Sequence, residues 1–144
     1  MIKNCLNLFR YKDWLKNIII FFPFIFGYNI RDYDQLFNLV VVFFAFSFLC
    51  SGIYILNDIL DVEKDRNHSI KKRVKPIANG NISLTFNKIC LALVVIILIF
   101  FFLLTDIFEI HFIAYFVIAI LYNLILKKII FFDVLILSFG YLIR

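Results

Sequence analysis

Long, predominantly apolar runs without a charged side chain leave this chain few ways to fold. Residues 36–56 and 89–104 are two such runs. Hydrophobic residues make up 64% of the 144 residues, whereas soluble domains contain roughly 45–50%. A membrane-spanning α-helix needs about 20 apolar residues, and the runs lack the alternation that is typical of membrane β-strands. The sequence therefore predicts an all-α, multi-span transmembrane bundle and excludes a soluble fold.

We expect about five membrane-spanning helices, at residues 15–28, 36–56, 89–104, 107–126 and 129–143. At ~20 residues per span, such a chain has no room for an extramembrane domain, so residues 1–144 are expected to form a single integral membrane domain. The first span is short and contains Pro23. No small-residue cleavage pattern follows the basic N-terminus, which indicates a retained span and not a removed signal.

The basic residues are concentrated in alternate loops. Of the fifteen Lys and Arg residues, four lie before or at the start of the first expected span, seven lie between the second and third, and two lie between the fourth and fifth. Cytoplasmic loops of membrane proteins are enriched in Lys and Arg. We therefore expect the N-terminus, the 57–88 loop and residues 127–128 to face the cytoplasm, with the protein in the inner (cytoplasmic) membrane.

Two other kinds of site are not indicated. The three Cys residues are widely spaced in or next to apolar runs, and no spacing typical of a zinc or redox site links them to each other or to the two His residues. The Phe-rich segments are expected to face lipid or to pack in the bundle. A nucleic-acid partner is therefore excluded.

Polar chemistry is concentrated directly after the second expected span. Asp58, Asp61 and Asp65 are spaced i, i+3 and i+7, so a helix that continues past Leu56 places them on one face, while Glu63 points away. Three carboxylates on one stripe repel one another, and a divalent cation such as Mg²⁺ relieves that repulsion while taking further ligands from substrate phosphates. The basic run at 71–75 could bind the same phosphates. Charge alone is also compatible with a solvated loop or with a patch that binds anionic lipid.

The segment NDILDVEKDR at residues 57–66, followed by KPIANG at 75–80, resembles the first aspartate-rich motif of the UbiA superfamily of intramembrane prenyltransferases. That motif has the form NDxxDxxxD, then a basic loop and Arg-Pro-(Ile/Leu)-Ala-x-Gly. RYKDWLKN at 10–17 resembles the family's Arg-Pro-x-x-Trp-x-Lys-Asn element, most familiar in the polyprenyl-phosphate phosphoribosyltransferase branch. Tyr122, Lys127, Asp133 and the segment 140–144 continue the likeness. Tyr11 stands where the family has Pro, and Lys75 where it has Arg, which keeps the charge but loses a bidentate fork.

The resemblance implies the N-terminal half of a nine-helix bundle whose central cavity opens to the cytoplasm and to lipid. It implies that Asp58, Asp61 and Asp65 are catalytic and bind Mg²⁺, which bridges them to a diphosphate leaving group. The branch implies transfer of phosphoribosyl from phosphoribosyl diphosphate to a polyprenyl phosphate. The candidate substrate-binding residues are Asn57, Arg10, Lys16, Lys71, Lys72, Arg73, Lys75, Tyr122 and Lys127.

Several alternatives stay open at this point. Asn57 could cap a helix end, the basic run at 71–75 could bind lipid headgroups, and Arg10 and Lys16 could simply anchor the N-terminus. The reaction could instead be prenyl transfer from a polyprenyl diphosphate to an aromatic acceptor. The resemblance covers about the first half of a family member, so a C-terminal half or a second copy is expected to complete the site. Otherwise the chain is an inactive truncated fragment. A transporter or channel subunit is less favoured, because the spans hold few ionisable or helix-breaking residues.

Overall fold

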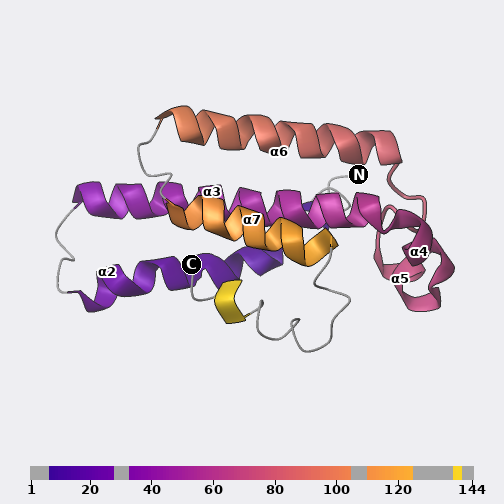
Figure 1. The fold of residues 1–144 in the computed structure, drawn as a ribbon, viewed down its shortest axis with the longest axis horizontal. Helices are drawn as coiled ribbons and strands as arrows, with labels where there is room; N and C mark the ends of the chain where they lie inside the picture. The colour runs from indigo at the N-terminus through magenta and orange to yellow at the C-terminus, as the bar shows by residue number, and fades with distance from the viewer. Residues whose placement is uncertain (1–6, 28–32, 105–109, 125–137, 141–144) are drawn as a thin grey trace. The chain divides into compact units, whose positions relative to one another are not determined.

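The computed structural model describes residues 7–27, 33–104, 110–124 and 138–140, and all regular secondary structure in these ranges is helical. The element order is η1 (Tyr11–Phe21), α2 (Phe22–Phe26), α3 (Tyr33–Leu60), α4 (Val62–Asn67), α5 (Ser69–Val74), α6 (Leu84–Leu104) and α7 (Ile110–Leu124) (Figure 1). The predicted all-α class is confirmed for the described residues.

Two of these helices, α3 and α6, are long and apolar enough to cross a membrane. They correspond to the second and third expected spans, and α3 extends the predicted 36–56 to Tyr33–Leu60. The apolar part of α7, Phe112–Asn123, is shorter. The fifth expected span lies outside the described residues except for 138–140. The structure thus contains two helices of spanning length among the described residues, fewer than the predicted five spans.

The expected first span differs most from the prediction. A 3-10 helix, η1, covers Tyr11–Phe21, and the five-residue helix α2 follows it with Pro23 in its first turn. Proline has no backbone N–H and its fixed φ suits the first turn of a helix, where that N–H has no intrahelical partner. A new helix therefore begins next to Pro23, and one expected helix becomes two short ones.

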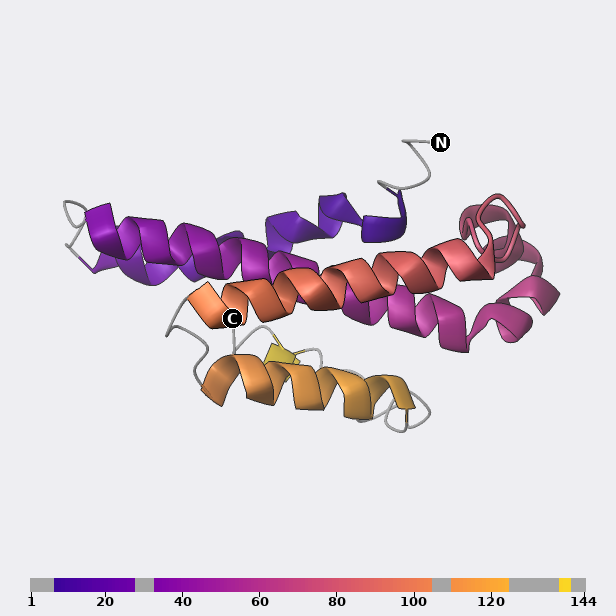
Figure 2. The ribbon, with the colours of Figure 1, turned by 90° about the horizontal axis from the view of Figure 1, so that it is seen from above.

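The described residues belong to two compact units, and α3 contributes to both. The first unit comprises Met1–Leu15 and Ser47–Phe100. Within it, the C-terminal part of α3 and α6 run side by side, and α4 and α5 form the connection at one end (Figures 1 and 2). Its buried apolar cluster consists of Leu8, Ile55, Ile82, Cys90 and Val94.

Gly52 sets the distance between α3 and α6 in this first unit. A Cβ atom at this position would lie 3.0 Å from Val94 Cγ1 and 4.0 Å from Leu91 Cδ1. Small residues at helix contacts allow backbones to approach closely in membrane bundles. The close approach buries Ile55 on α3 beside Val94 on α6. This packing holds the C-terminal end of α3, where Asp58 lies, against α6.

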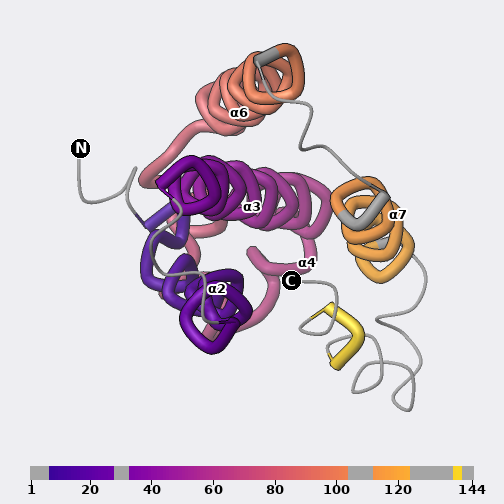
Figure 3. Tube along the Cα trace, turned by 90° about the vertical axis from the view of Figure 1, so that its left-hand side faces the viewer, coloured from indigo at the N-terminus to yellow at the C-terminus, as the bar shows by residue number. Residues whose placement is uncertain are grey.

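The second unit comprises Lys16–Phe46 and Phe101–Arg144 and is held by aromatic contacts. The Phe46 ring lies 5.1 Å from that of Phe112 and 5.5 Å from that of Tyr115, both on α7, and Phe21 lies 5.7 Å from Phe43. Figure 3 looks nearly along these helices and shows α2 and α7 on two sides of α3.

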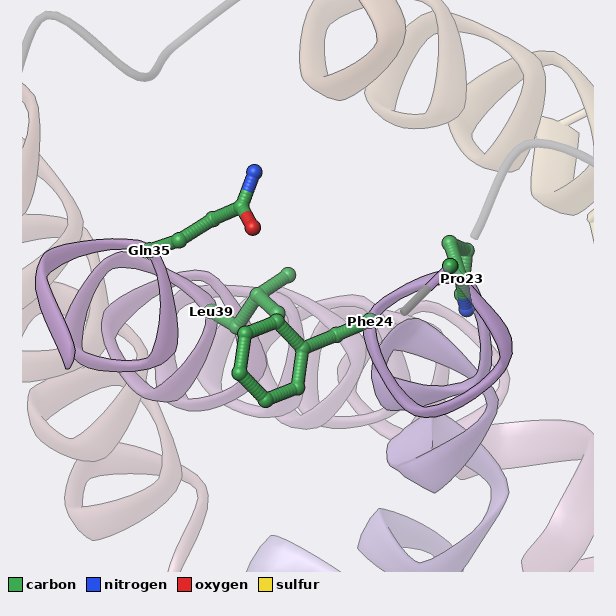
Figure 4. Close-up of a pocket in the computed structure, with 5 residues that line it drawn as sticks. Pro23, Phe24, Gln35 and Leu39 are labelled. Carbon is green, nitrogen blue, oxygen red and sulfur yellow. The ribbon is translucent and has the colours of Figure 1, made fainter. Parts of the chain in front are cut away.

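An open cavity of about 160 Å³ lies in the second unit, between α2 and the beginning of α3. Figure 4 shows that Pro23 and Phe24 line it from α2, and Gln35 and Leu39 from α3. None of the described residues that line it is charged. The described lining residues therefore offer a diphosphate no ionic partner, whereas the aspartate-rich segment at 57–66 lies in the first unit.

Candidate functional site

The candidate site begins where α3 ends. Asp61 separates α3 from α4 with φ −97° and ψ 6°. The helical hydrogen-bond pattern nevertheless continues across it, because the Asp61 N–H donates to Asn57 O and the Asp65 N–H donates to Asp61 O, both at 2.9 Å. The polypeptide therefore stays nearly helical through the junction, and Asp58 on α3 and Asp65 on α4 remain close enough to share one partner.

That partner is Lys75, whose ammonium lies between the two carboxylates. Lys75 Nζ is 2.6 Å from Asp58 Oδ1 and donates a hydrogen bond to Asp65 Oδ2 at 2.7 Å. The side chains of Asp58 and Asp65 are only 6% and 2% exposed, and that of Lys75 is 16% exposed. Two carboxylates and one ammonium thus form a nearly buried charge cluster, which we call the Lys75 cluster.

The backbone around Lys75 explains how it reaches this position. Lys75 follows α5 and has an extended backbone, with φ −87° and ψ 122°. A residue before proline disfavours the α-helical region, because the proline ring clashes with its backbone. Pro76 therefore ends α5 at Val74, and the extended residue between them carries its side chain back to α3 and α4.

The surroundings keep the Lys75 ammonium charged. Burial lowers its pKa, but the close contacts with Asp58 and Asp65 raise it by more, so that its pKa lies above the ordinary value of 10.5. A raised lysine pKa means that this ion pairing contributes its full stability below pH 10.5 and loses it only at higher pH. The Lys75 ammonium is therefore charged at physiological pH.

Two further cations stand at the edge of the Lys75 cluster. Arg10 Nη2 lies 3.6 Å from Asp58 Oδ1, and the Arg10 guanidinium stacks over the Tyr54 ring at 4.3 Å. Lys71 Nζ lies 3.6 Å from Asp65 Oδ1, and its side chain is half exposed. Three cations thus surround two carboxylates, and the excess positive charge favours an anionic ligand.

The N-terminal segment is fixed to α3 next to this site. Trp14 Nε1 donates a hydrogen bond to Ser51 Oγ at 3.0 Å, and the Ser51 hydroxyl lies 2.7 Å from the Phe9 carbonyl oxygen. The Trp14 ring also packs edge-on against Phe48 at 5.4 Å. Between these anchors, Arg10 has a φ of 48°, a left-handed conformation that non-glycine residues rarely adopt. The anchors hold the segment in a conformation that carries Arg10 to Asp58.

The remaining predicted site residues lie in different places. Asp61 is paired with Lys64 at 3.7 Å and its side chain is 19% exposed. Asn57 is half-buried, and Lys72 and Arg73 are exposed on α5. Lys16 and Tyr122 belong to the second unit, and Lys127 and Asp133 lie outside the described residues. The structure therefore joins Arg10, Asp58, Asp65, Lys71 and Lys75 from the predicted set.

The predicted one-face arrangement of Asp58, Asp61 and Asp65 is not reproduced as a three-carboxylate group. Within the described ranges, no group of three or more His, Cys, Asp or Glu side chains is placed to hold a metal ion. The carboxylates of Asp58 and Asp65 do converge on a cation, the Lys75 ammonium. Carboxylate oxygens are the ligands that Mg²⁺ uses in proteins, so this pair fits a metal by its chemistry, with Lys75 standing where a cation would bind.

Sequence reasoning missed two residues that lie beside this site, Ser51 and Tyr54, and one buried polar residue elsewhere in the same unit, Asn87. Ser51 and Tyr54 precede Asp58 by seven and four residues, so they lie on the same side of α3. A polar stripe within an otherwise apolar span could have indicated them. The third is Asn87 on α6, a fully buried residue whose side-chain amide has no hydrogen-bond partner among the described residues. It lies three residues before Cys90, on the helix face that packs on Ile55.

The sequence is similar to proteins of one known family. The model of the UbiA prenyltransferase family matches residues 18–144. A protein of Sinorhizobium fredii called y4nM is 38% identical over 82 residues, which are 57% of this chain and 16% of that protein. The decaprenyl-phosphate phosphoribosyltransferase of Mycobacterium tuberculosis is 33% identical over 84 residues, or 56% of this chain and 28% of the enzyme. The nodulation protein NoeC of Azorhizobium caulinodans is 38% identical over 86 residues, or 59% and 27%. The matched segment thus spans less than a third of each relative.

Proposed function

The chain belongs to the UbiA prenyltransferase family, and from this premise we propose that it forms the diphosphate-binding part of an intramembrane transferase. In this proposal the Lys75 cluster binds the diphosphate group of a phosphorylated substrate. The diphosphate is the leaving group when the rest of the substrate is transferred to an acceptor. The observation that carries the proposal is the convergence of Asp58 and Asp65 on one buried cation, ringed by Arg10 and Lys71.

Mg²⁺ is the proposed cofactor, and Asp58, Asp61 and Asp65 are its proposed ligands. Asp58 and Asp65 already offer carboxylate oxygens to a cation, and Asp61 lies at the junction between them. The Asp61 carboxylate lies 3.7 Å from the ammonium of the exposed Lys64, and an exposed ion pair of this kind contributes little stability. A bound Mg²⁺ neutralises charge that develops on a leaving diphosphate.

The basic side chains would hold the diphosphate itself. Lys71 and Arg10 lie at the edge of the cluster with their charged groups 3.6 Å from the carboxylates, so each can turn toward an incoming phosphate oxygen. Charge-assisted hydrogen bonds of this kind are about twice as strong as neutral ones. The remaining proposed substrate-binding residues are Asn57, Lys16, Lys72, Arg73, Lys75, Tyr122 and Lys127.

The proposed reaction is transfer of phosphoribosyl from phosphoribosyl diphosphate to a polyprenyl phosphate. The name of the M. tuberculosis relative, decaprenyl-phosphate phosphoribosyltransferase, supports this choice. The family description names prenyl transfer, which supports the alternative proposal, a reaction of a polyprenyl diphosphate with an aromatic acceptor. Both reactions need a bound and neutralised diphosphate, so the Lys75 cluster serves either.

The proposed membrane arrangement has five spans and corresponds to the N-terminal half of a nine-helix bundle. The helices α3 and α6 provide two of the spans. The Lys75 cluster lies on the segment that joins them, within the loop 57–88 that holds seven basic residues. That charge favours a cytoplasmic loop in the inner membrane, where phosphorylated small molecules are available. A C-terminal half or a second copy of the chain would supply the acceptor side.

The two reactions can be separated by a binding competition. The chain in lipid nanodiscs is saturated with Mg²⁺ and with labelled inorganic diphosphate, and either phosphoribosyl diphosphate or a polyprenyl diphosphate is added as competitor. The phosphoribosyl proposal predicts that phosphoribosyl diphosphate displaces the labelled diphosphate at a lower concentration than the polyprenyl diphosphate does. Stronger displacement by the polyprenyl diphosphate would favour prenyl transfer, and displacement by neither would contradict both.

A further inference from the structure

The position of Lys75 bears on the order in which ligands enter the site. Its ammonium contacts Asp58 Oδ1 at 2.6 Å and Asp65 Oδ2 at 2.7 Å. These are direct ion contacts, and both carboxylates are almost fully buried. The space between the carboxylates is therefore already filled by a cation that belongs to the chain.

A second cation cannot share this space with Lys75. A divalent ion and an ammonium between the same two carboxylates would lie a few ångströms apart, where like charges in a partly buried site repel strongly. A site without any cation is also unfavourable. The two buried carboxylates would then repel each other, and no positive charge would offset the cost of burying them. The pair of carboxylates therefore has room for one cation, and needs one.

Lys75 has the freedom to leave. Its ammonium is carried on a flexible four-carbon stem, and its side chain is 16% exposed, so one side of it already reaches solvent. The residue is extended and lies between the short helix α5 and Pro76. A rotation of the side chain alone can carry the ammonium from the carboxylates to an anion at the exposed edge, where Lys71 also stands.

We propose that Asp58 and Asp65 form a single-cation site that Lys75 fills in the absence of substrate, and that a diphosphate draws Lys75 away so that a divalent metal takes its place. The inference rests on the proposed function and deepens it. Lys75 is the residue that couples the two ligands: each ligand removes the obstacle to the other. Metal and diphosphate therefore bind cooperatively.

Thermodynamic linkage makes this coupling measurable. If diphosphate raises the affinity for metal by some factor, metal raises the affinity for diphosphate by the same factor. Couplings of this kind commonly amount to about 5–150-fold. Removing the Lys75 charge removes the resident competitor, so the metal should bind more tightly on its own and gain less from diphosphate.

The experiment measures Mn²⁺ binding by electron paramagnetic resonance to the full chain in nanodiscs, with and without inorganic diphosphate. The variants are wild type, Lys75→Gln and Lys88→Gln. Lys88 is an exposed lysine of α6, so its substitution removes the same charge outside the cluster. We expect Lys75→Gln to bind Mn²⁺ at least about five-fold more tightly without diphosphate and to lose most of the diphosphate effect. Lys88→Gln should behave as wild type.

The outcomes separate the inference from the proposed function. Metal binding that is equal in wild type and in folded Lys75→Gln, or weaker in the variant, overturns the inference and leaves the proposed function standing. Absence of metal binding from every variant, with or without diphosphate, contradicts the proposed function and with it the inference.

A measurement on the unaltered chain decides the matter if Lys75→Gln does not fold. An amine-reactive acetylating reagent is applied to wild type, and the modified lysines are identified by mass spectrometry. Lys75 should be protected without ligands, become reactive when Mn²⁺ is added alone at saturation, and be protected again when diphosphate follows. Lys71, which is exposed, should react without ligands as well. Unchanged protection of Lys75 at saturating Mn²⁺ would overturn the inference.

Discussion

The carboxylate of Asp65 accepts a hydrogen bond from Lys75 Nζ at 2.7 Å, although ten residues and a complete helix, α5, separate them in the chain. Asp65 is 2% exposed. Charges in a loop that merely faces solvent stay exposed, because burial of a charge is costly unless it is paired. The contact therefore argues against an unstructured charged loop and for a built ionic site at the end of α3.

The first prediction concerns stability. Asp65→Asn should destabilise the fold by on the order of 3 kcal/mol, because it leaves Lys75 with one carboxylate in a nearly buried position. Glu63→Gln is the matched control: Glu63 is exposed on the same helix, and its substitution should change stability by less than about 0.5 kcal/mol. Thermal unfolding in detergent, followed by circular dichroism, measures both. Equal stability of the two variants would show that the Lys75 cluster does not contribute measurably to the stability of the fold.

A second prediction separates binding from folding at Asp61. Its carboxylate is partly exposed and pairs with the exposed Lys64 at 3.7 Å, so Asp61→Asn should fold like wild type. If Asp61 completes the metal site, this variant should nevertheless bind Mg²⁺ with diphosphate at least about ten-fold more weakly, as expected for loss of a charged ligand. Calorimetric titration in nanodiscs gives the affinity. An unchanged affinity would remove Asp61 from the site.

Part of this structure was predicted correctly from local patterns in the sequence. The uncharged apolar runs predicted α3 and α6, because runs of this length and hydropathy are typical of membrane-spanning helices. The i, i+7 spacing of Asp58 and Asp65 predicted their proximity. The spacing could not predict the position of Lys75, which depends on α5 ending at Pro76.

Other parts of the fold depend on contacts between distant residues. The hydrogen bond from Trp14 to Ser51 joins residues 37 apart, and no local pattern in the sequence indicates it. Tryptophan is common at membrane interfaces, but that preference does not indicate Ser51 as a partner of Trp14. The replacement of the first expected span by η1 and α2 has a local signal, Pro23, but apolar content alone does not show that a new helix begins there.

A third prediction tests orientation in the membrane. In a variant with Cys5, Cys50 and Cys90 replaced by Ala, a single Cys is introduced at residue 81 or residue 107. Asn81 is exposed in the 57–88 loop, which should be cytoplasmic because it holds seven basic residues. A membrane-impermeant thiol reagent added outside intact cells should label residue 107 and leave residue 81 unlabelled until the cells are opened. Labelling of residue 81 in intact cells would place the Lys75 cluster on the wrong side for a cytosolic substrate.

The fourth prediction concerns turnover. Alignment of an acceptor with the reacting carbon supplies a large share of the rate advantage of such enzymes, and in the proposed function the described residues provide only the diphosphate side. Residues 1–144 alone should therefore bind metal and diphosphate but transfer no phosphoribosyl to a polyprenyl phosphate. Co-expression with the C-terminal half of a full-length relative should restore transfer. Turnover by the purified chain alone would mean that two copies build a complete site.

The central claim is that the Lys75 cluster binds diphosphate together with Mg²⁺, and calorimetric titration of the chain in nanodiscs with inorganic diphosphate tests it most directly. Diphosphate should bind in the presence of Mg²⁺ and at least about ten-fold more weakly in its absence. Asp58→Asn should lose the Mg²⁺-dependent part, because it removes one of the two buried carboxylates, whereas Glu63→Gln should keep it. Diphosphate binding of equal strength with and without Mg²⁺, or undiminished in Asp58→Asn, would contradict the claim.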